Sequence, residues 1–410
     1  MAPLRVNADR LWSDLMASGS IAQLPHGGVD RMSLTDGDRD VRNLFGYWCE
    51  AAGLSLTVDA MGNMFARREG TDPTLPPVML GSHLDSQSPG GKFDGPLGVI
   101  GALEAVRAIA EAGIATRRAL EVVNWTNEEG ARFSPGLMGS AVFAGVLPLA
   151  DAHASLDRDG KRFGDELRRI RYCGAAPVGG RAVDAYFELH IEQGPLLEEA
   201  GIVIGAVTHS HYSVFCDMEV LGENAHIQST PMLRRRNALV GAAKLIDAID
   251  AVGRAYAPAG SASAVVMDCW PNNRIIIPHR ATLSYGIMHP DEDGAAAMAR
   301  DVAQAEARIA AETGLVFNTL VRRQRAPIHF DEGMIQLTEA AAGALGYSCA
   351  RMRSRAGHDA FNMSRICPTE LLFVPCRDGW SHSEREWTEP EHCAAGVEVM
   401  ANAVLARANR

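Results

Sequence analysis

The chain has 410 residues, 47% of them hydrophobic and 22% charged, which is the composition of an ordinary globular protein long enough for two domains. The formal net charge of −11 argues against nucleic acid or an anionic membrane as the main partner, because both select a basic surface. No apolar run reaches the roughly 18 residues of a membrane span, and the first residues lack a signal-peptide core, so we expect a cytoplasmic protein.

The chain is expected to open with helices and a hairpin. Apolar residues recur at helical spacing in residues 7–18 and 38–52, and Asp36 or Asp38 is the expected cap of the second helix. Residues 54–67 alternate around a Gly-Asn turn, which is typical of a β-hairpin.

A strand, a helix and a second strand follow. The apolar run at 78–80 stops at Gly81 as a buried strand would, and residues 97–112 have the pattern of an amphipathic helix. Residues 119–125 return as a buried strand. Apolar strands that alternate with helices predict a parallel or mixed sheet covered by helices, so the expected fold class is α/β.

Polar side chains follow the first of these strands on a loop rich in Gly and Pro. His83, Asp85 and Asp94 lie on this loop. A rigid strand end that delivers His and carboxylate donors is a common metal-binding arrangement, so we expect His83 and Asp94 to be ligands. Asp85 is placed to accept the imidazole N–H that a metal leaves free. The alternative is that both Asp residues only cap the loop.

The next strand ends in two adjacent carboxylates, Glu128 and Glu129. Like charges this close repel each other, and a metal ion is the simplest counter-charge. Adjacent side chains point in different directions, so one can coordinate while the other acts as a general base for water. The alternative is an exposed pair on a loop.

Two more histidines follow buried strands. Residues 185–194 form a third strand with His190 near its end, and His382 follows the apolar run at 371–374 on a Gly/Ser loop. A lone His among apolar residues is usually a core side chain, but both arrive at the same topological place as the earlier donors. The eight cysteines are scattered without a C-x-x-C pair, which leaves nitrogen and oxygen as the donor atoms.

Between these segments lies a block of different organisation. It has four expected strands and two expected helices, at 213–222, 263–269, 275–287 and 315–321, and at 237–252 and 293–312. A strand-rich block inserted between portions of the first sheet predicts a separate α+β domain. We place this domain at 213–325 and the other domain at 1–212 and 326–410.

With these segments identified, the chain resembles the M20-type metallopeptidase and amidohydrolase superfamily. The resemblance is to its branch of N-carbamoyl-L-amino-acid hydrolases, β-ureidopropionases and allantoate amidohydrolases. Nearly the whole chain carries it, through GSHLDSQSPGGKFDG, NWTNEEGARF, YFELHIEQGP, AGHDA and FVPCRDGWSHS. It implies a mixed-sheet, metallo-exopeptidase-like catalytic domain with an inserted α+β domain, a four-stranded sheet plus two helices, that acts as lid and dimerisation domain.

The resemblance also implies a ligand set for two divalent metal ions per subunit. Zn²⁺ is the first choice, and Mn²⁺, Co²⁺ or Ni²⁺ suit the same donors. Asp94 would bridge the ions. His83 and His190 would complete one site, and Glu129 and His382 the other. Glu128 would be the general base, which assigns one of the two roles that the adjacent carboxylates offer.

Further residues are implied to contact the small-molecule substrate. His226 of one subunit of a homodimer would reach the other subunit's metals and stabilise the oxyanion. Gln193 lies in the EQGP motif, and Gly357 and His358 lie in AGHDA.

The substrate clamp departs from the family pattern. Relatives carry an Asn where this chain has Ile275 and an Arg where it has Met288, and these residues hold the substrate carboxylate. Arg grips a carboxylate with two charge-assisted hydrogen bonds, and Met makes none. The pocket also differs at His211 and beside Asn273, and Arg274 or Arg355 is a candidate replacement for the lost anion contact.

The sequence therefore predicts a metal-dependent amidohydrolase that cleaves a linear C–N bond of a ureido (N-carbamoyl) or amide compound with altered specificity. One alternative is an ordinary N-carbamoyl-L-amino-acid hydrolase or allantoate amidohydrolase. A second is a non-catalytic binding homologue, which would have no need of Glu128. A third is a dipeptidase or N-deacylase, which generally uses an acidic ligand where this chain has His190.

Overall fold

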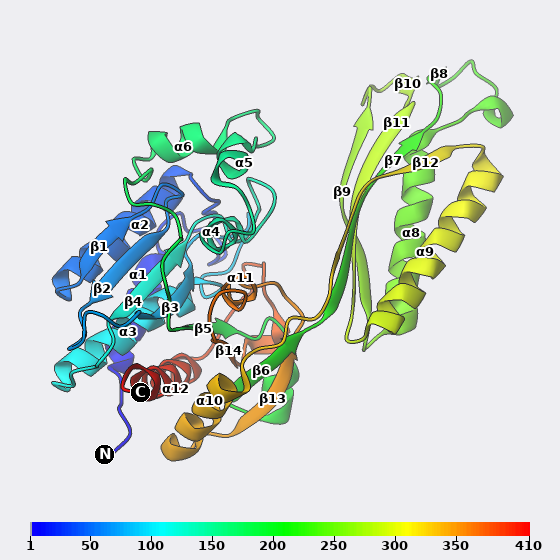
Figure 1. Cartoon of the computed structure of the whole chain (residues 1–410). Coiled ribbons are helices and arrows are strands. Elements are labelled where there is room, and N and C mark those ends of the chain that lie inside the picture. Colours follow the sequence, from blue (N-terminus) through cyan, green and yellow to red (C-terminus); the bar gives the residue numbers. More distant parts are fainter. Residues whose placement is uncertain (1) are drawn as a thin grey trace. The chain divides into compact units, whose positions relative to one another are not determined.

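The protein folds into two compact units, each described here by itself. The computed structural model describes residues 2–410 (Figure 1). The first unit consists of the chain up to His209 together with residues 329–410, and the second of residues 210–328. Each unit has its own hydrophobic core. The expected α/β class, with an additional α+β part, is confirmed.

The first unit is built on a mixed eight-stranded sheet in the order β1-β2-β4-β3-β5-β14-β6-β13. The strands are β1 (Ser55–Val58), β2 (Met64–Arg68), β3 (Val78–His83), β4 (Leu120–Trp125), β5 (Ala185–Ile191), β6 (Ile204–Ser210), β13 (Cys349–Ser354) and β14 (Thr369–Val374). The central strands β4, β3, β5 and β14 are parallel. They are buried along their whole length, because helices cover both faces of such a sheet. The expected hairpin is the antiparallel pair β1 and β2.

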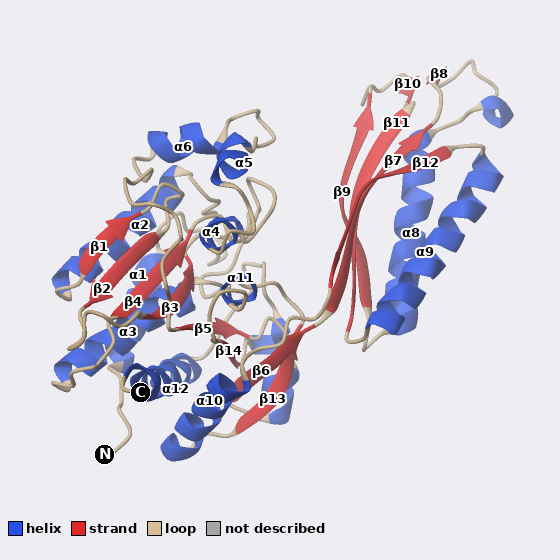
Figure 2. Cartoon of the chain, viewed as in Figure 1, coloured by secondary structure: helices blue, strands red, loops and turns tan. Residues whose placement is uncertain are grey.

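The helices of this unit pack on the sheet and on one another (Figure 2). They are α1 (Ala8–Gly19), α2 (Asp36–Ala51), α3 (Pro96–Glu111), α4 (Met138–Phe143), α5 (Leu149–Ala154), α6 (Phe163–Arg169), α7 (Leu196–Ala200), α10 (Glu332–Leu345), α11 (Ala360–Met363) and α12 (Pro390–Ala408), with a 3-10 turn η2 (Arg377–Gly379). Helix α3 packs so close to the strands that a Cβ atom added to Gly98 would lie 2.6 Å from the Leu189 carbonyl oxygen.

The cap of α2 differs from our expectation. Thr35, not Asp36 or Asp38, is the N-cap, and its hydroxyl accepts the Asp38 N–H. Asp38 is instead buried in an ion pair with Arg42, whose Nε lies 2.8 Å from the carboxylate. The carboxylate of Asp38 lies in the first turn of the helix and can reach Arg42 four residues later. The hydroxyl of Thr35 accepts the backbone N–H of Asp38, which has no partner within the helix.

The second unit is an antiparallel sheet in the order β12-β7-β11-β9, with two long helices packed against it. Its elements are β7 (Tyr212–Leu221), β8 (Ala225–His226), a 3-10 turn η1 (Met232–Arg234), α8 (Ala238–Tyr256), β9 (Ser261–Trp270), β10 (Ile276–Ile277), β11 (Arg280–His289), α9 (Glu292–Thr313) and β12 (Val316–Arg325). The strand expected at 275–287 is two strands, since Pro278 lacks an N–H and interrupts the ladder. Its first part, β10, pairs with β8.

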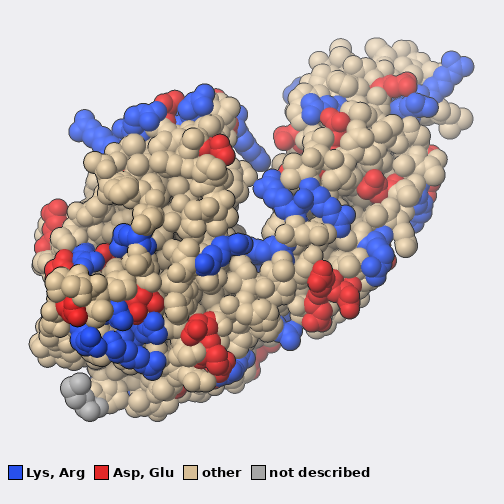
Figure 3. Space-filling view, in the orientation of Figure 1, with Lys and Arg blue, Asp and Glu red and all other residues tan. Residues whose placement is uncertain are grey.

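The charges and the apolar segments agree with the composition. On the face shown in Figure 3, Lys and Arg side chains are interleaved with Asp and Glu. Within residues 2–410, no helix combines the length and the apolar character that crossing a membrane requires.

Candidate metal centre

The predicted donors lie beyond the carboxyl ends of parallel strands. His83 is the last residue of β3, His190 lies near the end of β5, and Glu129 and His382 follow β4 and β14. Parallel strands end at one edge of their sheet, so side chains far apart in the sequence meet there.

The first donor group combines His83, Asp94 and His190, all buried. The Oδ1 atom of Asp94 lies 3.1 Å from Nε2 of His190 and 3.5 Å from Nε2 of His83. Each ring has its Nδ1 within 2.9 Å of a backbone carbonyl, of Asp85 and of Ile191 respectively. A carbonyl only accepts, so in each neutral ring Nδ1 carries the hydrogen and the Nε2 lone pair faces Asp94.

The second group combines Asp94, Glu129 and His382. Nε2 of His382 lies 3.3 Å from Oδ2 of Asp94 and 3.3 Å from Oε2 of Glu129. Asp94 therefore turns one oxygen to each group, as a bridging carboxylate does. The His382 side chain is 49% exposed, so this side of the centre is open to solvent.

The residues fit divalent cations. Nε2 of His83 is buried without a hydrogen-bond partner, although oxygens of Asp94 and Glu128 lie 3.5 Å away. Such an orphaned nitrogen among carboxylates is what an ion between them would satisfy. The donors are imidazole nitrogens and carboxylate oxygens, which suit several divalent ions. The two groups are compatible with a dinuclear metal site.

The electrostatics point the same way. Burial, and then the charge of Asp94, raise the pKa of the Glu129 carboxyl. Burial opposes the charge on His382, but the hydrogen bond that it donates to Asp94 and the charge of Glu129 raise the pKa of His382 to about 9. Several buried carboxylates thus share a small volume, where bound cations would offset their like charges.

Glu128 is the buried carboxylate beside the first group. Its Oε2 lies 3.5 Å from Nε2 of His83, and burial raises the pKa of its carboxyl well above the ordinary value. Its backbone N–H donates to Oδ1 of Asp85, and the N–H of Glu129 donates to Oδ2.

This arrangement corrects the expected role of Asp85. Its carboxylate does not accept the imidazole N–H of His83, since the nearest oxygen lies 3.9 Å from Nδ1. The backbone carbonyl of Asp85 takes that bond. The carboxylate instead holds the backbone of the Glu128-Glu129 pair, because two amides after the strand end need acceptors.

Several contacts were not expected from the sequence. Gln87 donates from Nε2 to Oε2 of Glu129 at 2.7 Å, and Ser381 donates to Oδ2 of Asp94 at 2.6 Å. Gln87 thereby orients the Glu129 carboxylate, and Ser381 orients the Asp94 carboxylate. The sequence indicates these contacts only by position, because Gln87 and Ser381 lie close to predicted metal ligands along the chain.

The predicted substrate residues of the first unit fall in two places. Gln193 donates from Nε2 to Oδ2 of Asp94 at 2.7 Å, and buried His358 packs edge-on against His190 with ring centres 4.5 Å apart. Gly357, beside it, is half-buried, and Arg355 is exposed.

Five other predicted site residues belong to the second unit: His211, His226, Asn273, Arg274 and Met288. His226 is exposed, and its Nδ1 accepts the backbone N–H groups of Gln228 and Ser229. The Asn273 side chain accepts the N–H of Ile275 at 2.9 Å. The part these five play in substrate binding stays a prediction.

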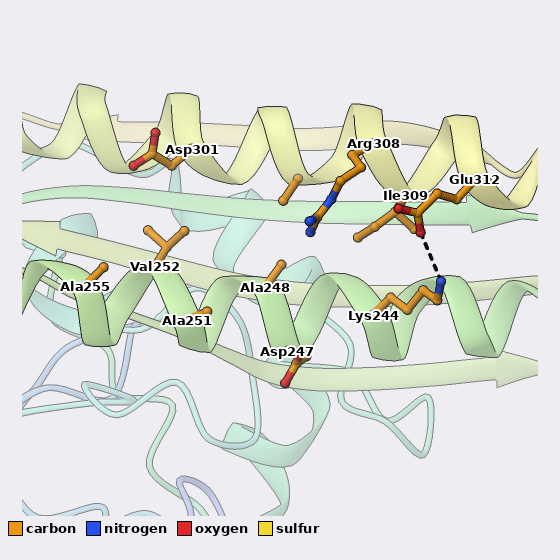
Figure 4. A pocket seen from close by; sticks show the side chains of 11 residues that line it. Lys244, Asp247, Ala248, Ala251, Val252, Ala255, Asp301, Arg308, Ile309 and Glu312 are labelled. Carbon is orange, nitrogen blue, oxygen red and sulfur yellow. Dashed lines mark hydrogen bonds and ion pairs between the residues drawn. The ribbon is translucent and has the colours of Figure 1, made fainter.

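The second unit also has a groove of about 480 Å³ between α8 and α9 (Figure 4). Alanines form much of its wall, and Lys244 pairs with Glu312 at one end. Among the described residues, only the two groups that share Asp94 bring three or more His, Cys, Asp or Glu donors within reach of one ion. The groove therefore offers no comparable centre.

Known proteins match this chain over nearly its whole length. Peptidase family M20/M25/M40 matches residues 79–406. An N-carbamoyl-L-amino-acid amidohydrolase of Rhizobium meliloti is 43% identical, over 98% of this chain and 96% of its own. A ureidoglycolate hydrolase of Arabidopsis thaliana is 31% identical, over 97% and 86%. The crystal structure of a hydantoinase/carbamoylase family amidase from Burkholderia vietnamiensis is 44% identical, covers 99% and 98%, and superposes with a TM-score of 0.94.

Proposed function

The chain belongs to peptidase family M20/M25/M40, in the branch of N-carbamoyl-L-amino-acid amidohydrolases and ureidoglycolate hydrolases, and we propose that it hydrolyses a ureido or amide small molecule in the cytoplasm. It is a hydrolase of carbon–nitrogen bonds other than peptide bonds. The observation that carries the proposal is the pair of donor groups that share Asp94, with buried Glu128 beside them.

Two divalent ions would be held by five side chains, those of His83, Asp94, Glu129, His190 and His382. Zn²⁺ is the first choice, and Mn²⁺, Co²⁺ or Ni²⁺ suit the same donors. Such ions, when bound, polarise a carbonyl and lower the pKa of a water molecule towards neutrality. Glu128 takes a proton from the attacking water as the water oxygen bonds to the carbonyl carbon. It then gives that proton to the nitrogen as the C–N bond breaks. Burial raises its pKa, which favours a carboxyl that can hold the proton between the two transfers.

The substrate is proposed to differ from an ordinary carbamoyl amino acid. Ile275 and Met288 stand at the positions of the family's carboxylate clamp, and the Ile275 side chain is 60% exposed. Neither can replace the charge-assisted grip of Arg. We propose a compound that is bulkier or lacks the α-carboxylate, with Arg274 or Arg355 as a substitute anion contact. The alternative, an ordinary carbamoylase or ureidoglycolate hydrolase, is supported by the names of the relatives.

We further propose that the second unit acts as lid and dimerisation domain. The exposure of His226 supports this, since a solvent-exposed imidazole is available to a second subunit. Sedimentation of the purified enzyme should then give a homodimer. Replacing His226 by Ala should lower kcat without changing the metal content.

The decisive experiment is a substrate panel with metal-loaded enzyme, comprising ureido and amide compounds with and without a carboxylate. We expect turnover of at least one ureido or amide compound and poor turnover of N-carbamoyl-L-amino acids. Met288→Arg should improve the latter. Glu128→Gln should lower kcat by about 10²- to 10⁴-fold and keep both ions.

Two results would contradict the proposal. Efficient turnover of N-carbamoyl-L-amino acids by the wild type, with no gain from Met288→Arg, would exclude altered specificity. An unchanged kcat in Glu128→Gln would exclude Glu128 as the base.

A further inference from the structure

One buried carboxylate joins the loop that carries Asp94 to the loop that carries His382. Oε1 of Glu386 accepts the backbone N–H of Phe93 at 2.8 Å and that of Asp94 at 3.0 Å. Glu386 is only 2% exposed, and it lies four residues beyond His382. A single oxygen of Glu386 therefore holds the backbone of Asp94, the proposed bridging ligand, in place.

The other oxygen of Glu386 reaches the same ligand from the side-chain direction. Ser381 Oγ lies 3.3 Å from Oε2 of Glu386 and donates to Oδ2 of Asp94 at 2.6 Å. Ser381 immediately precedes His382. Both the backbone and the carboxylate of Asp94 are thus oriented by the segment that supplies His382.

Aromatic side chains pack the two loops against each other. Phe93 and Trp387, the neighbours of Asp94 and Glu386, have ring centres 5.5 Å apart in an edge-on contact. Trp12 of α1 packs on both, at 5.8 Å and 5.4 Å. This packing limits the freedom of either loop to move without the other.

The backbone leaves room for the carboxylate at one residue. A Cβ atom added to Gly91 would lie 1.9 Å from the carboxyl carbon of Glu386 and 2.0 Å from each oxygen. Any side chain at position 91 would therefore displace Glu386.

A buried carboxylate is costly unless hydrogen bonds compensate it, and the backbone N–H groups of Phe93 and Asp94 offset part of that cost for Glu386. We infer that Glu386 is a positioning residue of the dinuclear centre: it holds Asp94 and His382 in register so that one carboxylate can serve both ions. The inference rests on the proposed function, because it concerns the affinity of the same site for its ions. Groups that orient metal ligands typically change metal affinity 10- to 100-fold when removed.

The test is a metal titration that needs no substrate. Metal-free wild type and variants compete with a chromophoric chelator for Zn²⁺, and Co²⁺ absorption reports the ligand geometry. We expect Glu386→Ala to weaken binding of the ions by about 10- to 100-fold and to alter the Co²⁺ spectrum. Glu386→Gln should fall between this variant and wild type, because its amide oxygen can still accept the two N–H groups.

A second variant attacks the same contact from the opposite side. Gly91→Ala should reproduce the loss seen in Glu386→Ala by pushing the carboxylate away. Gly343→Ala, at an exposed helix position with open space around it, is its matched control. Glu384→Ala, on the same loop, is the control for the carboxylate, since within residues 2–410 Glu384 accepts a hydrogen bond only from the backbone N–H of His26, at 3.3 Å. Both controls should bind the ions as wild type does.

The outcomes separate the two proposals. If wild type binds two ions per chain and the Glu386 and Gly91 variants bind them equally well, this inference fails and the proposed function stands. If wild type binds no divalent ion, the proposed function fails and the inference fails with it. Should Glu386→Ala not fold, Glu386→Gln and Gly91→Ala decide by the same criterion.

Discussion

The role of a single residue in this protein depends on contacts that form only in the folded chain. The donors His83, Asp94, Glu129, His190 and His382 were accessible to prediction, because each is a His or a carboxylate at the end of a buried strand or on the loop that follows one. The role of Asp85 was not, because its partners are backbone amides of a loop reached only in the folded chain. Hydrogen bonds to backbone groups leave no pattern of residue types, so such contacts require coordinates.

A carboxylate away from the centre gives a pH prediction. Glu370 in β14 is fully buried, with Thr338 and Glu339 of α10 nearby, and burial raises the pKa of its carboxyl well above the usual value. The folded state therefore binds a proton that the unfolded state releases above its ordinary pKa of about 4.3. Stability is fully present below that value and falls as pH rises towards the folded pKa.

Glu370→Gln removes this proton linkage. Its stability relative to wild type should rise by up to about 1.4 kcal/mol for each pH unit above the unfolded-state pKa. Urea unfolding of both proteins at pH 5 and pH 8 measures the difference. Glu332→Gln is the control of opposite sign, since the hydrogen bond from Arg351 lowers the pKa of the exposed Glu332 carboxyl. A gain for Glu370→Gln that does not depend on pH would contradict the argument.

Among the helices and strands, the buried strands could be predicted from their apolar residues, whereas the shortest helices could not. Strands β3, β4, β5 and β14 are buried along their whole length and are rich in apolar residues, because they are covered on both faces. Helices α4, α5, α6, α7 and α11 have four to seven residues, too few to show a helical period, and went unpredicted. The longer helices α10 and α12 also went unpredicted. We predicted one strand at 275–287, because the alternation of side chains along a strand gives no sign of the turn at Pro278.

The approach of α3 to the sheet predicts a sign reversal between two glycines. Gly98→Ala should destabilise the protein by about 1 to 3 kcal/mol, because the new Cβ meets the Leu189 carbonyl at 2.6 Å and overpacking outweighs helix propensity. Gly343→Ala in α10 should stabilise it by about 0.5 to 1 kcal/mol, since nothing lies within 4 Å. Chemical denaturation of the two variants checks both signs, and equal shifts would refute the packing argument.

At the scale of the molecule, two cores share one chain. The insertion was predictable because a strand-rich block interrupts the first sheet in sequence, and the family resemblance supported the same division. Both donor groups come from the first unit alone. Ligand binding stabilises only the part of the molecule that forms the site.

This separation predicts a selective response to metal removal. Chelation should lower the melting temperature of the first unit and leave the second unchanged, with about 2.7 kcal/mol lost when the free ion had been at 100 times its Kd. Calorimetry measures both transitions. Trp270 is the single tryptophan of the second unit, so fluorescence of Trp270→Phe follows the first unit alone. A metal-dependent shift in both transitions would show that the units unfold together.

The shared edge of β3, β4, β5 and β14 collects donors that the chain supplies from position 83 to position 382. No peptide fragment can therefore gather the pair of ions proposed here. A molecule truncated after β14 would lack His382 and also Glu386 and Ser381, which orient Asp94. It should lose one ion and bind the other more weakly, so counting ions per chain offers a simple assay of whether a preparation is intact.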